Sequence, residues 1–223
     1  MPRPPLTSAE YWDLYKPYRA EGEQPAPTTD RFEWTQFPGH GPGPEVLGAP
    51  RHALELGPGE GTDAVHLARL GIQVTAVDFS AFQIERARRW WSDVPGVRFV
   101  HADVCEFLSR DTTEYDAIYS MWGAAWFTDP EFLLPLVAKR LVPGGVFVFS
   151  HAEPGPGTYG PQQMRGKWLE GRERELTVLR WQYAPGVWAD LLKRNGFTDV
   201  DARIVPPPGN EPLGTLLVRA EAA

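Results

Sequence analysis

The residues best suited to chemistry in this sequence lie in two short segments, ALELGPGEG at 53–61 and VTAVDFS at 74–80. Gly57, Gly59 and Gly61 carry no Cβ, so their backbone can approach a ligand closely. Asp78 lies 21 residues after Gly57 and ends a short apolar run. A carboxylate at the tip of such a strand can accept both hydroxyls of a ribose. The two segments therefore predict a pocket for an adenosine-containing cofactor.

The loop chemistry separates two classes of cofactor. A dinucleotide site needs G-x-G-x-x-G, with a pyrophosphate on the helix N-terminus. Here the spacing is G-x-G-x-G, and Thr62 stands in the place of the third dinucleotide glycine. Glu60 and Asp63 suit the positive end of the next helix, but they would repel a pyrophosphate. The loop favours cationic S-adenosylmethionine over NAD.

From about residue 51 to its C-terminus the chain resembles the class I S-adenosylmethionine-dependent methyltransferases. Besides the two segments above, VRFVHADV at 97–104 and LVPGGVFVFS at 141–150 match that family in order and spacing. The resemblance implies that Glu55 lies near the methionine end of the cofactor and that Asp78 holds its ribose. It assigns the remaining cofactor contacts to the glycine loop and the next two strand ends: Gly57, Pro58, Gly59, Phe79, Asp103 and Val104.

The elements that must position these residues alternate strand and helix, which predicts a mainly parallel sheet covered on both faces. We expect strands at 52–57, 73–79, 97–103, 115–121 and 146–151, and helices at 62–70, 80–91, 130–140 and 187–195. The resemblance adds a closing hairpin, which we place at 199–205 and 214–220. The predicted fold is α/β, a Rossmann-like doubly wound, seven-stranded, mostly parallel sheet with an antiparallel strand in the C-terminal hairpin.

Size and composition limit the classes of protein. With 223 residues, of which 42% are hydrophobic, we expect one catalytic domain at 51–223 preceded by an extension at 1–50. The formal charge of -7 argues against a nucleic-acid partner. Cys105 is the single cysteine, which excludes an internal disulfide and a thiolate metal centre, and we predict no metal. No apolar stretch suits a secretory signal or a membrane span, so we expect a cytoplasmic protein.

Two segments outside the common core are expected to bind the second substrate. Residues 1–50 and 151–161 are rich in Pro and Gly, and 167–181 reads as a charged helix. Functional loops in open α/β sheets gather at the carboxyl ends of the strands. We therefore expect the extension at 1–50 to act as a lid and the later segment to form a wall of the acceptor site.

Methyl transfer from a sulfonium needs mainly alignment of two reactants and exclusion of water. A general base is needed only when the acceptor keeps its proton near neutral pH. His151, at the end of the fifth predicted strand, is the candidate base, facing the acceptor mouth. The alternative is a loop histidine bound to a backbone carbonyl.

The end of the fourth strand carries Ser120-Met121-Trp122-Gly123 where amino-methylating DNA enzymes carry an Asn/Asp-Pro-Pro-aromatic motif, so base methylation is disfavoured. We assign Ser120 to the cofactor side. Trp122 and Trp126 offer flat walls for an aromatic or apolar acceptor, and the alternative for each is burial under a neighbouring helix.

Two tyrosines complete the candidate site. Tyr15 shares a helical face with Tyr11 and could close over the methionine end of the cofactor, the alternative being ordinary docking of that helix. Tyr183 could reach the acceptor.

The favoured function is S-adenosylmethionine-dependent methyl transfer to a small-molecule acceptor, such as an aromatic or apolar secondary metabolite. A peptide or protein methyltransferase, a non-catalytic partner subunit with the same fold, and an NAD-linked oxidoreductase remain as alternatives. The acceptor atom and the oligomeric state are not specified by the sequence.

Overall fold

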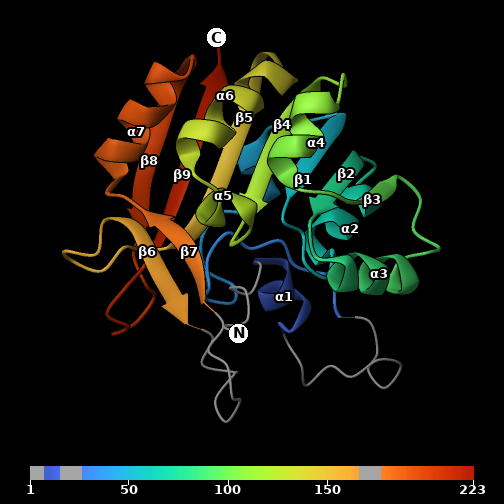
Figure 1. Ribbon diagram of the computed structural model, residues 1–223, viewed down its shortest axis with the longest axis horizontal. Coiled ribbons are helices and arrows are strands. Elements are labelled where there is room, and N and C mark those ends of the chain that lie inside the picture. Colours follow the sequence, from blue (N-terminus) through green and yellow to red (C-terminus); the bar gives the residue numbers. More distant parts are fainter. Residues whose placement is uncertain (1–7, 16–26, 166–176) are drawn as a thin grey trace, which may run out of the picture.

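The computed structural model describes residues 8–15, 27–165 and 177–223. Its centre is a seven-stranded sheet with helices on both faces (Figure 1). In order across the sheet the strands are β3 (Val97–His101), β2 (Gln73–Asp78), β1 (His52–Leu56), β4 (Tyr115–Met121), β5 (Leu141–Ala152), β9 (Thr215–Ala222) and β8 (Phe197–Val205). This is the predicted α/β fold, and the prediction is confirmed.

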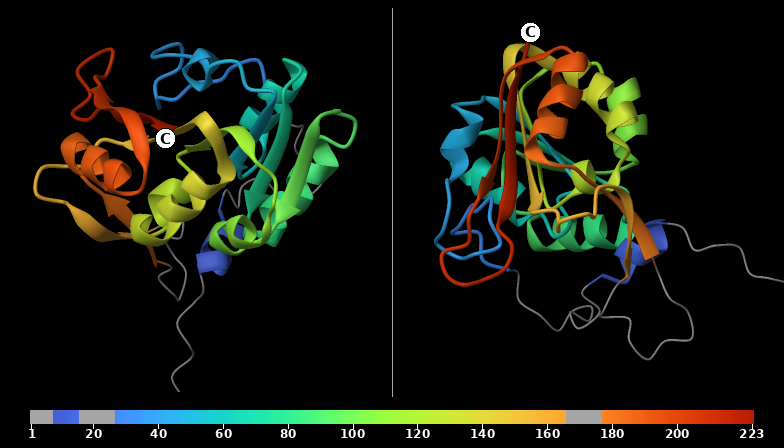
Figure 2. Two further views of the ribbon diagram at one scale, coloured as in Figure 1. Left: turned by 90° about the horizontal axis from the view of Figure 1, so that it is seen from above. Right: turned by 90° about the vertical axis from the view of Figure 1, so that its left-hand side faces the viewer.

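The strand directions complete that agreement. β1 to β5 pair in parallel, whereas β9 runs antiparallel to both β5 and β8. The side view in Figure 2 shows the long β8 and β9 strands next to each other at one end of the sheet. Because β1, β2 and β3 are in parallel register, the loops that follow them meet at one edge of the sheet, which we call the carboxyl edge.

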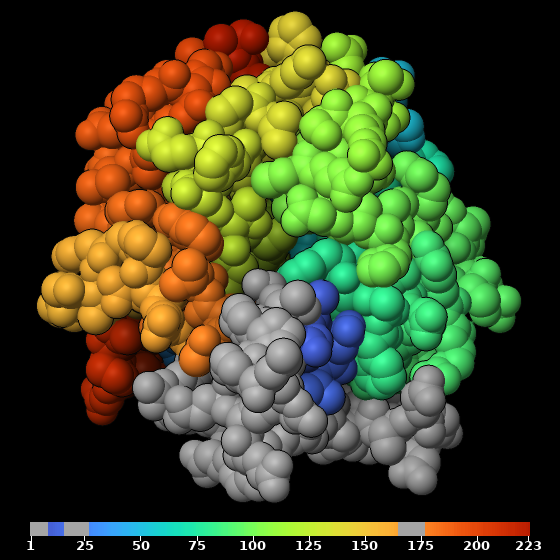
Figure 3. Space-filling view, viewed as in Figure 1, coloured from blue at the N-terminus to red at the C-terminus, as the bar shows by residue number. Residues whose placement is uncertain are grey.

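A separate antiparallel ribbon follows β5, made of β6 (Gly160–Arg165) and β7 (Thr177–Gln182). The predicted helix at 167–181 is therefore wrong for 177–181, and its earlier part lies outside the described residues. The reason is visible in TVLRWQ, which contains the strand-favouring residues Thr177, Val178 and Trp181, with Val178 buried between exposed neighbours. The short helix α1 (Ser8–Asp13), blue in Figure 3, packs against the ribbon and against α3.

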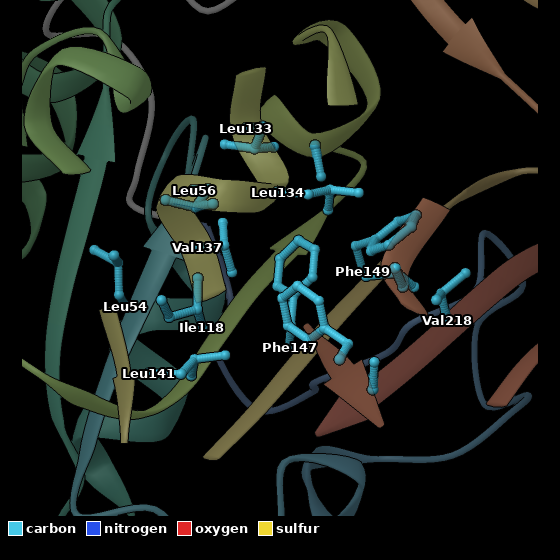
Figure 4. Packing of buried hydrophobic residues seen from close by; sticks show 14 of the residues in the cluster. Leu54, Leu56, Ile118, Leu133, Leu134, Val137, Leu141, Phe147, Phe149 and Val218 are labelled. Carbon is cyan, nitrogen blue, oxygen red and sulfur yellow. The ribbon is translucent and has the colours of Figure 1, made fainter. Parts of the chain in front are cut away.

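One face of the sheet is covered by α4 (Val104–Arg110), α6 (Pro130–Arg140) and α7 (Pro185–Arg194). Phe147 and Phe149 of β5 project from the sheet toward Leu134 and Val137 of α6 (Figure 4). Strands buried on both faces read as continuous apolar runs, and this is why the sequence located them well.

The opposite face is covered by helices over one half and by N-terminal residues over the other. α2 (Thr62–Arg69) and α3 (Ala81–Trp90) pack beside β1 to β3. The other half of this face is covered by Phe32, Trp34 and Leu47, and Leu47 lies in the 3-10 helix η1 (Pro44–Leu47). These three side chains belong to the hydrophobic cluster that also contains residues of β4, β5 and β9. Part of the segment expected to act as a lid is thus core, and the domain boundary at residue 50 stays a prediction.

Within the described part of the chain, no helix combines the length and apolar character that crossing a bilayer requires.

Candidate functional site

A cavity of about 1250 Å³ lies at the carboxyl edge of the sheet. Its lining comes from the loops after β1, β2, β3 and β4, from α1, from the helix α5 (Ala124–Phe127) and from β7. Ligands of open α/β sheets bind at this edge, outside the strand ends. The position of the cavity therefore agrees with the position predicted from the sequence.

The three glycines of the turn after β1 have different surroundings. Gly59 has φ 53°, and a Cβ built on it would meet nothing within 4 Å. At Gly57 a Cβ would lie 2.5 Å from the backbone nitrogen of Ala124, and at Gly61 it would lie 2.5 Å from the ring of Phe99. Only Gly59 therefore presents bare backbone to open space, whereas Gly57 and Gly61 are required by packing. Gly57 and Pro58 also line the cavity.

Asp78 joins the end of β2 to this turn. One carboxylate oxygen accepts a hydrogen bond from the Gly59 N–H at 3.1 Å, and the other accepts from the Ser80 N–H at 2.9 Å. Burial raises the pKa of Asp78, and these two hydrogen bonds oppose the rise. The carboxylate borders the cavity together with Phe79, so both stand where the ribose and adenine were expected.

The third acidic position, Asp103, also lines the cavity, next to Val104. Asp103 is the N-cap of α4, and one of its oxygens accepts from the backbone N–H groups of Cys105 and Glu106 at 2.9 and 3.0 Å. An N-cap carboxylate is held in one orientation by such bonds. The strand ends thus place Asp78 and Asp103 along the same wall.

Glu55 and Ser120 are not among the cavity-lining residues. Glu55 is buried and accepts a hydrogen bond from the Tyr119 hydroxyl at 3.1 Å, and burial raises its pKa well above the ordinary value. The Ser120 hydroxyl donates to the Leu56 carbonyl at 2.8 Å and accepts from the Ala125 N–H at 3.1 Å. In this structure Glu55 is bonded to the neighbouring strand β4, and Ser120 joins the end of β1 to the start of α5. Contact of either residue with a cofactor stays a prediction.

Tyr11 of α1 and Tyr15, two residues after the end of that helix, both line the cavity, and their contact with a cofactor stays a prediction. The segment 8–15 is attached to α3 by hydrogen bonds. The Ser80 hydroxyl donates to the Asp13 carboxylate at 2.5 Å, and the Gln83 amide donates to the Tyr15 carbonyl at 3.4 Å. The same N-terminal segment therefore docks on α3 and borders the cavity.

Trp122 and Trp126 both line the part of the cavity beyond β4, with their rings 5.6 Å apart and nearly perpendicular. Trp122 has φ 51°, a left-handed conformation that is strained for a residue with a bulky side chain. Its indole nitrogen donates to the Trp34 carbonyl at 3.3 Å, which fixes the ring. Strained backbone of this kind gathers at ligand sites.

The structure does not place His151 and Tyr183 in the cavity lining. β5 continues to Ala152 and pairs with β9, so His151 lies inside the sheet rather than at its mouth. Its imidazole is fully buried, stacks on Trp126 at 5.0 Å, and is hydrogen-bonded through Nδ1 to the Ala152 carbonyl. Burial lowers the pKa of His151 to about 4. The expectation that it faces the acceptor mouth is not met, and Tyr183 instead packs on Trp188 at 5.3 Å.

Sequence reasoning missed Arg180, which lies on β7 and lines the cavity. Its guanidinium stands 5.2 Å from the ring centre of Trp126. The signal for a strand is the β-branched and aromatic content of 177–182, whereas the charges before it favour the helix that we expected.

Comparison with known proteins finds methyltransferases among those that the chain is similar to. Residues 53–145 match a family described as a methyltransferase domain. Over 102 residues the chain is 31% identical to a trans-aconitate 2-methyltransferase of Paracidovorax citrulli, an alignment covering 45% of this chain and 38% of the relative. Over 95 residues it is 36% identical to a demethylmenaquinone methyltransferase of Clavibacter sepedonicus, covering 43% and 38%. The matched segments thus span about two fifths of these curated relatives.

Among solved structures, the chain is similar to the 1,6-didemethyltoxoflavin-N1-methyltransferase of Burkholderia thailandensis, a structure with 1,6-didemethyltoxoflavin and S-adenosylhomocysteine bound. The TM-score is 0.59 at 25% identity, covering 79% of this chain and 73% of that one.

Proposed function

We propose, from the match of residues 53–145 to a family of methyltransferase domains and from the fold, that this chain transfers the methyl group of S-adenosylmethionine to a small-molecule acceptor. The observation that carries the proposal is a single cavity that runs from the glycine turn and Asp78 to the aromatic residues beyond β4. Its volume of about 1250 Å³ exceeds the roughly 300–1,000 Å³ of an ordinary ligand pocket. It therefore has room for two reactants side by side.

The residues of the cofactor half fit S-adenosylmethionine. Asp78 and Asp103 would hold the ribose and the adenine amino group, Phe79 would pack on the adenine, and Gly59 would allow close approach of the methionine part. The cofactor supplies a methyl group already activated by its sulfonium. The acidic wall suits that positive charge, and Asp63 beside the turn adds to it, whereas Glu60 is paired with Arg86.

The acceptor half suits a small molecule better than a peptide. α1 and β7 both contribute to the lining, so the cavity is walled on the side away from the sheet. Trp122, Trp126 and Trp181 provide flat apolar surfaces there. A peptide or protein methyltransferase needs an open groove at this place. The formal charge of -7 likewise disfavours a nucleic-acid acceptor.

The names of the three proteins compared above specify small-molecule substrates, which supports this reading, although a relative 33% identical over 108 residues is named as a tRNA methyltransferase of Escherichia coli. For this chain the acceptor and the atom methylated are proposals. The single cysteine, which cannot form an internal disulfide, agrees with a cytoplasmic setting.

The test is binding of S-adenosylmethionine, measured by titration calorimetry and by thermal unfolding. A ligand present at about 100 times its Kd adds roughly 2.7 kcal/mol to the stability of the protein it binds. We expect S-adenosylmethionine and S-adenosylhomocysteine to give this stabilisation and NADH to give none. Absence of binding heat, or equal protection by NADH, would reject the proposed function.

A further inference from the structure

We propose that the acceptor carries a carboxylate and that Arg180 binds it within the cavity. This inference rests on the proposed function and adds the chemical class of the acceptor. It follows from the surroundings of Arg180, from its position relative to the cofactor half, and from the acid–base groups that line the cavity.

Arg180 is half-buried, and its guanidinium lies over the ring of Trp126. Its Nε is buried without a hydrogen-bond partner, and among the described residues no carboxylate forms an ion pair with it. Arg86 pairs with Glu60 and Arg219 pairs with Glu221. Arg140 also has a buried Nε without a partner, but unlike Arg180 it does not line the cavity. A desolvated cation without an anion is costly, and a bound anion offsets that cost. Burial also lowers the pKa of Arg180.

A second donor lies close to Arg180. Tyr11 on α1 lines the same cavity, and its pKa is coupled electrostatically to the Arg180 charge. Burial raises the pKa of Tyr11 to about 12, so its hydroxyl keeps its proton at neutral pH and can donate. A guanidinium and a hydroxyl suit a carboxylate, which accepts several hydrogen bonds. The neighbouring tryptophan rings suit an apolar body for the same molecule.

The position of Arg180 points to the acceptor rather than to the cofactor. β7 packs against α5, which follows β4, whereas the nucleoside groups are expected along the ends of β1, β2 and β3. That end of the cavity carries Asp63, Asp78 and Asp103, which would repel an anion, whereas Glu60 is paired with Arg86 and Asp129 lies beyond α5. Arg180 is the one cation among the described lining residues, so it is the group that would hold a carboxylate in the acceptor half.

The chemistry of a carboxylate acceptor also fits the groups present. The carboxylate oxygen forms a bond to the methyl carbon while the carbon–sulfur bond breaks, and that electron pair goes to sulfur. An anion and a sulfonium become a neutral ester and a thioether, and no proton leaves. A general base is therefore unnecessary, and among the described lining residues there is no histidine or lysine. His151, outside the cavity, has no role to fill in such a step.

The test uses the intact chain saturated with S-adenosylhomocysteine, with benzoate, cinnamate and trans-aconitate as probes and the corresponding neutral amides as controls. Binding is measured by calorimetry and by the shift in Tm. We expect at least one carboxylate to bind while its amide does not. Arg180→Met should weaken that binding about 10-fold or more, because it removes a charge-assisted, bidentate partner. Arg180→Lys should restore part of the affinity, since it keeps the charge and loses the fork.

Arg98→Met is the matched control, because Arg98 lies at an exposed position of β3 away from the cavity. It should change neither the affinity for the carboxylate probes nor the affinity for S-adenosylhomocysteine. The proposal also requires that Arg180→Met leave the affinity for S-adenosylhomocysteine within about 3-fold. A loss of about 10-fold or more would assign Arg180 to the amino-acid carboxylate of the cofactor and overturn the proposal. Equal binding of carboxylates and amides, or no binding by any carboxylate, would also overturn it. Failure of the proposed function is distinguishable, because the unsubstituted protein would then not bind S-adenosylhomocysteine.

Discussion

Asp78 uses one carboxylate both to hold the glycine turn and to face the cavity. Asp78→Asn keeps the size of the side chain but removes its charge and one of its acceptor oxygens. Hydrogen bonds to a charged group contribute about 1.5–3 kcal/mol, so the Kd for S-adenosylhomocysteine should rise about 10- to 100-fold. Titration calorimetry measures this, with Asp93→Asn, an exposed position outside the cavity lining, as the control. An unchanged Kd in Asp78→Asn would refute the ribose assignment.

His151 should make stability depend on pH. The unfolded imidazole takes up a proton near pH 6.5, but the buried one does so only near pH 4. Between these values the unfolded state binds more protons, so stability falls as pH falls, by about 3 kcal/mol in all, and no further below pH 4. Urea unfolding of the wild type and of His151→Gln from pH 7.5 to 4.5 compares the two slopes. The variant should lose less stability on acidification, and identical slopes would contradict the burial of a neutral imidazole.

The residues that sequence could identify are those fixed by short-range geometry. Asp78 and Asp103 end parallel strands, so the spacing of the strands alone brings them to one edge. The inward orientation of Ser120 and the burial of His151 depend on how far β4 and β5 extend and on what packs over them. Arg180 could not be predicted because it reaches the cavity through β7, whose pairing with β6 joins distant residues.

At the scale of elements, a substitution in the glycine turn can test whether the turn affects cofactor affinity separately from the free energy of unfolding. Gly59→Ala puts a methyl group into open space at the cavity and a left-handed conformation on alanine. The conformation costs about 1–2 kcal/mol, and the methyl should weaken binding of S-adenosylhomocysteine about 10-fold or more by blocking its approach. Calorimetry and urea unfolding measure the two effects.

Gly71→Ala is the matched control for Gly59→Ala, because Gly71 has φ 89°, meets nothing within 4 Å and does not line the cavity. It should show a similar loss of stability and no change in binding. Equal loss of binding in both variants would mean that the turn acts only through stability.

The elements that sequence patterns located well are those that local rules determine. β4 and α6 begin and end at the predicted residues, because a continuous apolar run and an Asp-Pro helix start leave few alternatives. α4 and α5 were missed, since both are short and follow strand ends where the chain was read as loop. The β6–β7 ribbon was missed because pairing partners, rather than intrinsic preference, decide a two-stranded sheet.

At the scale of the whole molecule, the described residues among 1–50 contribute to two parts of the fold. α1 lines the cavity, while Phe32, Trp34 and Leu47 complete the core on the sheet face that α2 and α3 leave uncovered. The Trp34 carbonyl also accepts a hydrogen bond from the indole nitrogen of Trp122. This bond connects the core residue Trp34 to the expected acceptor wall. Stability and site geometry are therefore expected to depend on the same segment.

Trp34→Ala should test that dependence. The side chain is fully buried and its indole nitrogen donates to the Gly43 carbonyl at 2.9 Å, so truncation leaves a cavity and an unpaired acceptor. Substitutions of this kind cost about 3–5 kcal/mol, and urea unfolding measures the loss. Phe132→Ala, at a side chain that is 69% exposed on α6, should stay within about 0.5 kcal/mol of the wild type. A loss below about 1 kcal/mol in Trp34→Ala would show that the extension is dispensable to the core and that its role is confined to the cavity.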